Sequence, residues 1–348
     1  MRHLASIQRI SSISPIDGAD RIELAHILGW QCVAKKNEFK EGDLAVYFEI
    51  DSFLPIKPEF EFLRSSSYKN NPLLGEGFRL KTIQLKGHLS QGLLLPLSIL
   101  PDNIRDTAKE GDDVTEILGI RKYEIPEMAT GNGVCIGDLP HFIFKTDETR
   151  IQSKPGLLDE FKGIPYYIST KMDGSSFSLA LDSNNNPRVC SHNYELKADE
   201  SCLFYKYAKR YLNLMKSWKE KNHLDTLVLQ GEFCGPKIQG NKIKLLNPEW
   251  FVFNIYEDGI LGGYSNLLDS QSFIGHKIVP IEELGDDIST LYKDIPSLLN
   301  RSIGNYSNID SPKEGIVIRP QTPIKSQLLN NHYLSMKVIN NQFLVKCN

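Results

Sequence analysis

The chain has 348 residues and a formal net charge of −3, with 41% hydrophobic and 24% charged residues. This length is enough for about two domains of ~150 residues. The composition is typical of globular proteins and excludes wholesale disorder and fibrous repeats. The balanced charge excludes a polycationic protein, so a nucleic-acid surface must be a local patch. No run of ~18 apolar residues is present, which predicts that the chain does not span a membrane.

The cysteines indicate a reducing environment. There are six, and none forms a Cys-x-x-Cys pair. Scattered single thiols favour an intracellular protein, cytoplasmic or nuclear, over a disulfide framework or a zinc site. The opening residues, MRHLASIQRI, lack the apolar core of a signal peptide and agree with that expectation.

Residues 1–118 are predicted to be rich in β-strands. Short apolar or alternating runs are separated by clusters of Gly, Pro, Asp and Ser, as in strands joined by turns. A short helix is expected at Asp102–Lys109. Five short strands with long connections favour a small closed barrel of the OB kind. The expected strands are Met1–Ile10, Ile22–Lys36, Leu44–Ile50, Phe78–Gln84 and Gln91–Leu97.

Every periodic pattern stops at Ile125–Gly133, which contains one proline and two glycines and is predicted to be a linker. We therefore expect one domain over residues 1–126 and a second, mixed α/β domain over 127–348. The triplet Asn184–Asn186 before Pro187 is typical of a hairpin tip. The strands expected in the second domain are Tyr166–Thr170, Phe177–Leu181, Leu227–Gln230, Phe251–Tyr256, Gly315–Ile318 and Tyr333–Val338.

One longer helix is expected in the second domain, from Glu200 to about Lys219. Its apolar residues recur at a near-helical period and predict a face that packs on the core. The residues of this face are Leu203, Tyr207, Tyr211, Leu214 and Trp218.

The segment Lys171–Ser176 (KMDGSS) follows a predicted strand and contains an Asp-Gly turn. A lysine at a strand end is fixed at its base and free at its tip, so it can attack an electrophile and form a covalent adduct. With an ordinary pKa of ~10.4, the amine is protonated at neutral pH. A nucleophilic role therefore requires a lowered pKa, which nearby cations or a metal could supply. Alone, the motif also fits a solvated lysine beside an ordinary turn.

Four downstream segments carry further candidate residues. Glu232 lies in GEFCGP, Phe253 in the aromatic run WFVFNIY, Glu314 in KEGIVIR, and Lys337 in SMKVIN. Each has an ordinary interpretation as a core aromatic, a surface acid or a solvated cation.

In this order and spacing, the five segments resemble motifs I, III, IIIa, IV and V of the covalent nucleotidyltransferases. The resemblance extends from about His141 to the C-terminus. Pro140–Arg150 is similar to the lead-in of RNA ligases, and Gly231–Gln239 (GEFCGPKIQ) to another of their segments. Tyr47–Pro55 and Leu85–Leu97 resemble the OB domain of Deinococcus- and Naegleria-type RNA ligases. The resemblance implies an α+β fold: an N-terminal OB-like β-barrel, then a mixed α/β nucleotidyltransferase domain with antiparallel sheets around an ATP pocket.

The resemblance implies an ATP-dependent RNA ligase. Such an enzyme joins RNA 3′-OH and 5′-phosphate ends through a lysyl-AMP intermediate and an adenylylated 5′ end. Its expected partners are RNA ends or a nicked duplex, the domain at 1–126 would bind RNA, and the chain is expected to be a monomer. DNA ligases and capping enzymes carry a further OB domain after motif V, whereas eleven residues follow Lys337 here, which favours an RNA ligase. A capping-type guanylyltransferase and a non-catalytic OB-fold nucleic-acid-binding protein with a degenerate nucleotidyltransferase domain remain alternatives.

The resemblance also implies roles for individual residues. Lys171 would attack the α-phosphate of ATP, with Lys337 on that phosphate and Asp173 as a further catalytic residue. Glu314, Asp173 and Glu232 would hold Mg²⁺ or Mn²⁺. The expected nucleotide contacts are Phe253 on adenine, Glu232 on the ribose, Arg150 on phosphate, Thr170 in base selection, and Gly174, Ser176 and His192.

The sequence departs from the family pattern at two positions. Motif V often has a second lysine where this chain has Ile339, so one phosphate contact is either missing or supplied by Lys346 or Arg319. His192 stands where relatives have an arginine, and because histidine is only partly charged at neutral pH, its phosphate contact would be weaker and pH-dependent.

Overall fold

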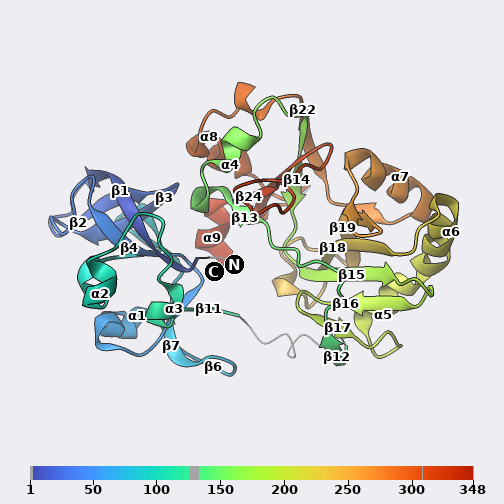
Figure 1. Cartoon of the computed structure of the whole chain (residues 1–348), viewed down its shortest axis with the longest axis horizontal. Coiled ribbons are helices and arrows are strands. Elements are labelled where there is room, and N and C mark those ends of the chain that lie inside the picture. The colour runs from blue at the N-terminus through green and yellow to red at the C-terminus, as the bar shows by residue number, and fades with distance from the viewer. Residues whose placement is uncertain (1–2, 125–132, 308, 348) are drawn as a thin grey trace. The chain divides into compact units, whose positions relative to one another are not determined.

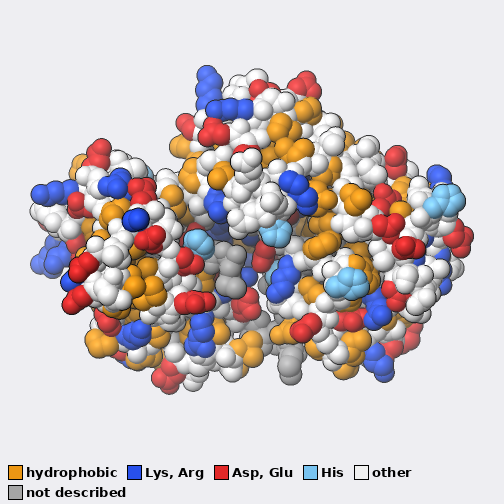
Figure 2. Space-filling view, in the orientation of Figure 1, with side chains coloured by type: hydrophobic (Ala, Val, Ile, Leu, Met, Phe, Trp, Pro, Cys, Tyr) orange, Lys and Arg blue, Asp and Glu red, His pale blue; other side chains and the backbone are white. Residues whose placement is uncertain are grey.

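The computed structural model describes residues 3–124, 133–307 and 309–347 (Figure 1). The chain forms two compact units, Met1–Glu127 with Leu344–Asn348, and Met128–Phe343. The predicted linker Ile125–Gly133 lies outside the described residues, apart from Gly133. In the described ranges, no helix is both long and apolar enough to cross a membrane. Basic and acidic side chains are intermixed over the visible surface of both units, in keeping with the small net charge (Figure 2).

The first unit contains a five-stranded sheet in the order β10-β4-β1-β2-β3, a four-stranded sheet β11-β5-β7-β6 and the hairpin β8-β9. The short helices are α1 (Arg64–Ser67), α2 (Asp102–Arg105) and α3 (Thr115–Leu118). The strands are β1 (Ala5–Pro15), β2 (Ile22–Ile27), β3 (Trp30–Lys35), β4 (Leu44–Phe48), β5 (Ser52–Leu54), β6 (Tyr68–Asn71), β7 (Gly75–Arg79), β8 (Thr82–Leu85), β9 (His88–Gln91), β10 (Leu93–Pro96) and β11 (Arg121–Lys122).

Strand β1 belongs to both halves of the five-stranded sheet. Its first part pairs with β4 and its second part with β2, and the register shifts between Ile10 and Ser12. Such an irregularity bends a strand, which lets one long strand curve around a barrel-like core. Strand β4 is buried on both faces, with Val46 and Phe48 in one apolar cluster and Tyr47 in another.

Three expectations for the first unit were wrong in detail. The single strand expected at Ile22–Lys36 is the hairpin β2-β3, because Leu28 and Gly29 form a turn in which Leu28 has a φ of 52°. That turn lies inside an apolar run and has no polar signature. The strand expected at Phe78–Gln84 is divided between β7 and β8. The helix expected at Asp102–Lys109 ends at Arg105.

The second unit contains an eight-stranded and a five-stranded sheet. The five-stranded sheet has the order β13-β24-β23-β14-β22, and its strands are β13 (Thr149–Arg150), β14 (Tyr166–Lys171), β22 (Ile281–Gly285), β23 (Gly315–Pro320) and β24 (Met336–Ile339). The eight-stranded sheet has the path β12-β17-β16-β15-β18-β19-β20, with β21 beside β19. Its strands are β12 (Cys135–Asp138), β15 (Ser175–Leu181), β16 (Pro187–Cys190), β17 (Tyr194–Leu196), β18 (Leu227–Cys234), β19 (Glu249–Glu257), β20 (Ile260–Leu261) and β21 (Lys277–Ile278).

Helices cover both sheets (Figure 1). An aromatic cluster that includes Phe177, Phe204 and Trp250 joins the large sheet to α5. Leu157 and Leu298 join α4 and α8 to the smaller sheet. The helices of the second unit are α4 (Leu157–Glu160), α5 (Leu203–Ala208), α6 (Leu212–Asn222), α7 (Tyr264–Ile274) and α8 (Ile295–Ser302), and α9 (Asn341–Cys347) crosses the boundary between the units.

The long helix expected from Glu200 to about Lys219 was only partly right. It consists of α5 and α6 separated by a 3-10 turn at Lys209–Tyr211. Leu214, which was expected on the apolar face, is 43% exposed, because the turn rotates the second half of that face. The hairpin tip at Asn184–Asn186 is confirmed, since it joins β15 and β16.

Candidate active site

Strand register brings the predicted cations to one face of the smaller sheet. Arg150 pairs with Lys337, Lys337 with Val317, and Val317 with Ser169. Side chains that are directly paired across neighbouring strands lie on the same face. Lys171 is two residues beyond Ser169 and therefore shares this face. Residues far apart in the sequence thus form one cationic row.

The large sheet supplies the opposite wall of a cavity. Ser176 of β15 pairs with Glu232 of β18, and Phe253 lies at a register shift between β18 and β19. The extra residue at this irregularity changes the direction of the side chain. The residues lining the cavity are Thr146, Glu148, Ser169, Thr170, Lys171, Met172, Glu232, Phe253, Val279, Val317 and Arg319.

Carboxylates gather at the Lys171 end of this cavity. Lys171 Nζ donates a hydrogen bond to Glu314 Oε2 over 2.8 Å. The backbone N–H of Gly174 donates to Glu232 Oε1 over 3.1 Å, and Lys242 Nζ lies 2.9 Å from Asp173 Oδ2. A Cβ atom at Gly174 would lie 2.4 Å from a backbone carbonyl of β18, so the turn requires glycine.

Burial and neighbouring charges shift the pKa values at this end. Burial opposes the ammonium form of Lys171, but the carboxylates of Glu314 and Glu232 outweigh it and raise the pKa of the lysine. Burial raises the pKa of Glu232 to about 8, and burial and Glu314 raise that of Asp173. The lowered pKa that a nucleophilic Lys171 requires is therefore not produced by these residues alone. Added positive charge on the carboxylates would reverse the balance.

Lys337 marks the basic end of the same face. Burial, with the charges of Lys171 and Arg150, lowers the pKa of Lys337 to about 8. Arg319 is buried, forms an ion pair with Glu148, and lies 5.4 Å from the centre of the Phe253 ring. A cation over an aromatic face is attracted by the ring quadrupole, so Arg319 holds Phe253 at the cavity wall.

The segment before Arg150 contacts the site through three consecutive residues. Thr146 Oγ1 lies 2.9 Å from Ser176 Oγ, Asp147 Oδ2 lies 3.6 Å from His192 Nε2, and Glu148 binds Arg319. The sequence interpretation assigned a role only to Arg150 in this lead-in. Thr146, Asp147 and Glu148 could have been identified as site residues because they belong to the same lead-in motif.

Two predicted residues have contacts that differ from the expected ones. The Thr170 hydroxyl donates to Glu282 Oε1 over 2.7 Å, so it is engaged by a protein carboxylate. The side chain of His192 lies against Asp147 and is not among the residues that line the cavity.

At the position of the missing motif V lysine, Ile339 is buried with 3% exposure. Of the two proposed substitutes, Arg319 lines the cavity. Lys346 belongs to the segment grouped with the first unit.

The donor chemistry at the acidic end fits a divalent metal. Within residues 3–124, 133–307 and 309–347, no three His, Cys, Asp or Glu side chains form a preassembled metal cluster. However, Asp173, Glu232 and Glu314 surround one amine and offer the oxygen donors that hard cations prefer. Burial, together with repulsion from Glu314 and Asp173, raises the pKa of Glu232, and a cation would relieve that repulsion.

Comparisons with known proteins agree with this geometry. An OB-fold domain family matches residues 4–97, and the RNA ligase family matches residues 164–339. No curated protein sequence matched. The solved structures that match include Naegleria gruberi RNA ligase, as an apo mutant, at 33% identity and a TM-score of 0.86, covering 99% of this chain and 97% of that chain.

Two further structures of the Naegleria gruberi enzyme match at 33% identity and cover 99% of this chain and 98% of that chain. One is a mutant with AMP and Mn, with a TM-score of 0.86, and the other holds PPi, with a TM-score of 0.85. Fold and site define an OB-fold domain joined to a nucleotidyltransferase domain. The chain belongs to the RNA ligase family. The predicted α+β fold and the interpretation as an ATP-dependent RNA ligase are confirmed.

Proposed function

We propose that this ligase joins an RNA 3′-OH end to a 5′-phosphate end in three displacements at phosphorus, with Lys171 as its nucleophile. The observation that carries the proposal is the position of Lys171 Nζ. It lies in the cavity, 2.8 Å from Glu314 Oε2, on the sheet face that also carries Lys337 and Arg150. The Naegleria enzyme, which shares this fold, has been seen with ATP and Mn and with PPi.

In the first displacement, Nζ of Lys171 attacks the α-phosphorus of ATP. The N–P bond forms, the bond to pyrophosphate breaks, and the amine loses its proton. In the second, an RNA 5′-phosphate oxygen attacks the AMP phosphorus and frees the lysine. In the third, the 3′-OH attacks the RNA 5′-phosphorus and expels AMP. Little covalent chemistry is left to the protein, so positioning and charge neutralisation dominate catalysis.

Other side chains have roles set by their place on the strands around Lys171. Lys337 and Arg150 are on the same sheet face as the nucleophile, where their charge offsets that of the α-phosphate oxygens. Phe253, held by Arg319, presents its ring to stack on adenine. Glu232 is placed to accept a hydrogen bond from the ribose, and Gly174 and Ser176 support the nucleotide from the turn and the strand that follow Lys171.

Mg²⁺ or Mn²⁺ would be held by Glu314, Asp173 and Glu232, directly or through water. When bound, such an ion neutralises phosphate charge and favours the unprotonated lysine. The raised pKa of Lys171 fits this dependence, because the carboxylates that stabilise its ammonium form are the groups a metal would engage. Lysine adenylylation should therefore require both ATP and a divalent metal.

We further propose that the OB-like domain, taken as residues 1–126, binds RNA, that the adenylyltransferase domain is 127–348, and that the enzyme acts as a monomer. An OB domain offers a groove for the nucleic-acid backbone. A nicked duplex with an RNA 3′-OH is the substrate most in keeping with the family resemblance. The test compares end joining on identical nicks that carry a ribose or a deoxyribose on the 3′-OH side.

The proposed intermediate is tested by incubation with α-labelled ATP and Mn²⁺ followed by denaturation. The wild type should retain label, and Lys171→Ala should retain none. The same variant should still seal RNA with a pre-adenylylated 5′ end, because that step does not use the amine. Lys162→Ala removes a lysine whose side chain is 60% exposed and serves as the matched control.

Three outcomes would contradict the proposal. Loss of the third step in folded Lys171→Ala would indicate a structural role for the lysine. Absence of label from the wild type would favour a non-catalytic nucleic-acid-binding protein, and label from GTP in place of ATP would favour a capping-type guanylyltransferase.

A further inference from the structure

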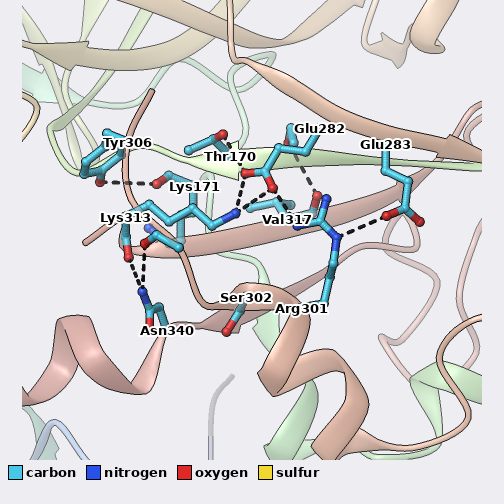
Figure 3. Close-up of polar contacts among 12 residues, drawn as sticks. Thr170, Lys171, Glu282, Glu283, Arg301, Ser302, Tyr306, Lys313, Val317 and Asn340 are labelled. Atoms are coloured by element: carbon cyan, nitrogen blue, oxygen red, sulfur yellow. Dashed lines mark hydrogen bonds and ion pairs between the residues drawn. The ribbon is translucent and has the colours of Figure 1, made fainter. Parts of the chain in front are cut away.

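A cluster of charged side chains lies behind the nucleophile, between β14, β22 and α8 (Figure 3). Because neighbouring side chains of a strand point to opposite faces, Thr170 and Lys171 face opposite sides of β14. Thr170 is 7% exposed and is directed into this cluster. The sequence analysis assigned no role to the acidic and basic side chains that surround Thr170 there.

Glu282 is the centre of the cluster. Its Oε1 accepts hydrogen bonds from Thr170 Oγ1 over 2.7 Å and from Lys313 Nζ over 2.6 Å. Its Oε2 lies 2.5 Å from Lys313 Nζ and accepts from Arg301 Nη1 over 2.8 Å. Burial disfavours the charge on Glu282, but the hydrogen bonds from Lys313 and Thr170 outweigh burial and lower its pKa. The carboxylate is therefore ionised at neutral pH.

Two of the three partners of Glu282 directly precede the two central residues of the active site in the sequence. Thr170 directly precedes Lys171, and Lys313 directly precedes Glu314. Lys171 and Glu314 are in turn hydrogen-bonded to each other, with Lys171 Nζ 2.8 Å from Glu314 Oε2. One buried carboxylate thus binds the residue before the nucleophile and the residue before the acid.

Side-chain hydrogen bonds also fix the backbone around the contact between Lys171 and Glu314. Tyr306 accepts a hydrogen bond from the N–H of Glu314 over 3.2 Å and donates to the carbonyl of Lys171 over 3.4 Å. Asn340 donates to the carbonyl of Lys313 over 3.0 Å. These bonds fix the backbone, whereas the side chain of Lys313 depends on Glu282 for both hydrogen bonds that its amine donates within the described residues.

We propose that Glu282 is a positioning residue for lysine adenylylation, which sets the spacing of Lys171 and Glu314 by binding Thr170 and Lys313. The inference rests on the proposed function of Lys171. Lys313 is 4% exposed, so loss of Glu282 would leave its charge buried without a partner. Such a charge is strongly unfavourable, and the side chain would move toward water, drawing Glu314 with it. A displacement of ~1 Å at a reacting centre can cost about 100-fold in rate.

The next residue on β22 is a matched control. Glu283 accepts from Tyr166 and Tyr292, each over 2.7 Å, and from Arg301 over 3.1 Å. Its side chain is 20% exposed, against 17% for Glu282. It shares Arg301 with Glu282 but has no hydrogen bond to Thr170 or Lys313. Glu283→Gln therefore disturbs the same cluster without breaking the link to the site.

The experiment measures single-turnover formation of labelled enzyme from α-labelled ATP and Mn²⁺, at a temperature well below the unfolding midpoint of every variant. Glu282→Gln should lower the rate at saturating ATP by about 30-fold, with the ATP concentration for half-maximal rate within about threefold of wild type. Glu283→Gln should stay within about threefold of wild type in both quantities. Equal rates for the two variants would overturn the proposal and assign Glu282 a structural role.

A second variant decides the matter if Glu282→Gln does not fold. Thr170→Val removes one hydroxyl at nearly constant volume and leaves Glu282 bound to Lys313 and Arg301. It should slow labelling by about fivefold at saturating ATP. Where Glu282→Gln does fold, adding Thr170→Val to it should slow labelling no further, because both substitutions act through one link. Wild-type labelling by Thr170→Val would overturn the proposal. Failure of the function itself is distinct, because the wild type would then carry no label.

Discussion

One face of the smaller sheet carries two similar amines in opposite electrostatic settings, one at its acidic end and one at its basic end. Lys171 and Lys337 lie on the same face of one sheet and are both half-buried. At the acidic end, Glu314 and Glu232 overcome burial and raise the pKa of Lys171. At the basic end, burial, Lys171 and Arg150 lower the pKa of Lys337 to about 8. Because burial disfavours the ammonium form of both amines, the neighbouring charges decide the direction in which each pKa shifts.

The opposite pKa shifts of Lys171 and Lys337 suggest how ATP and a metal would change the protonation of each lysine. A bound polyphosphate adds negative charge beside Lys337 and favours its ammonium form. A divalent cation on the carboxylates removes the stabilisation of the Lys171 ammonium. ATP and metal together would therefore favour a protonated Lys337 and an unprotonated Lys171. Attack by Lys171 requires its unprotonated amine.

The largest expected effect comes from removing the cation at the basic end. Lys337→Met should slow lysyl-AMP formation on the order of 100-fold, because a charge that stabilises the phosphate oxygens in the transition state is lost. Single-turnover labelling with α-labelled ATP measures the rate. Lys277→Met, at a lysine with 57% side-chain exposure, should behave as wild type. A Lys337→Met enzyme with full activity would remove this lysine from the phosphate site.

Removing the carboxylate of Glu314 should lower the pKa of Lys171 and yet slow the adenylylation of that lysine. Glu314→Gln removes the carboxylate that contributes most to the raised pKa of Lys171, so that pKa should fall. In the enzyme without nucleotide, acetylation of Lys171 at pH 9 should accelerate by about tenfold, as followed by peptide mass spectrometry. Labelling by ATP should nevertheless slow most at limiting Mn²⁺. Unchanged labelling at limiting metal would argue against a metal-binding role.

The half-buried acid Glu232 extends the comparison of the two ends to the pH dependence of folding stability. Its pKa is raised from 4.5 to about 8, so the folded state holds a proton that the unfolded state releases between these values. The stabilisation is complete below about pH 4.5 and is lost as the pH rises through about 8. Between pH 6 and 8, the wild type should lose about 2 kcal/mol that Glu232→Gln keeps. Thermal unfolding of both proteins at the two pH values, without metal or nucleotide, measures this difference, and parallel pH dependences would contradict it.

The smallest expected effect on the rate of ligation comes from substituting His192, one of the two departures from the family pattern. His192 lies 3.6 Å from Asp147, whose side chain is 56% exposed, and such exposed pairs contribute about 0.2–1 kcal/mol. His192→Asn should therefore change the rate of ligation by less than about threefold, with little variation between pH 6 and 8. A larger, pH-dependent loss in ligation assays would show that the histidine contacts phosphate.

Local patterns predicted the elements of the second unit better than those of the first. The expected strands at Tyr166–Thr170 and Gly315–Ile318 correspond to β14 and β23 within two residues. The hairpin β2-β3 was missed because its turn, Leu28-Gly29, is embedded in an apolar run. The helix break after Ala208 was missed because its residues keep a helical polarity pattern through a 3-10 turn.

Of the site residues that the motifs identify, Lys171, Glu232 and Phe253 line the cavity, whereas Arg150, Glu314 and Lys337 are not among the lining residues. Glu282 and Arg301 belong to no motif, and their sequence neighbourhoods resemble ordinary surface segments. Their importance becomes visible when β22 and α8 are packed beside β14.

The sequence alone determined the chemical inventory of this protein: an amine at a strand end, three acids, an aromatic residue and a second amine, in the order of a nucleotidyltransferase. These signals are local, because each depends on residue type and short-range spacing. The tertiary structure decided which of these groups touch and what charge each carries. Strand register places Lys171 against Glu314 and Lys337 beside Arg150, and pKa values follow from burial and from neighbours that are distant in the chain.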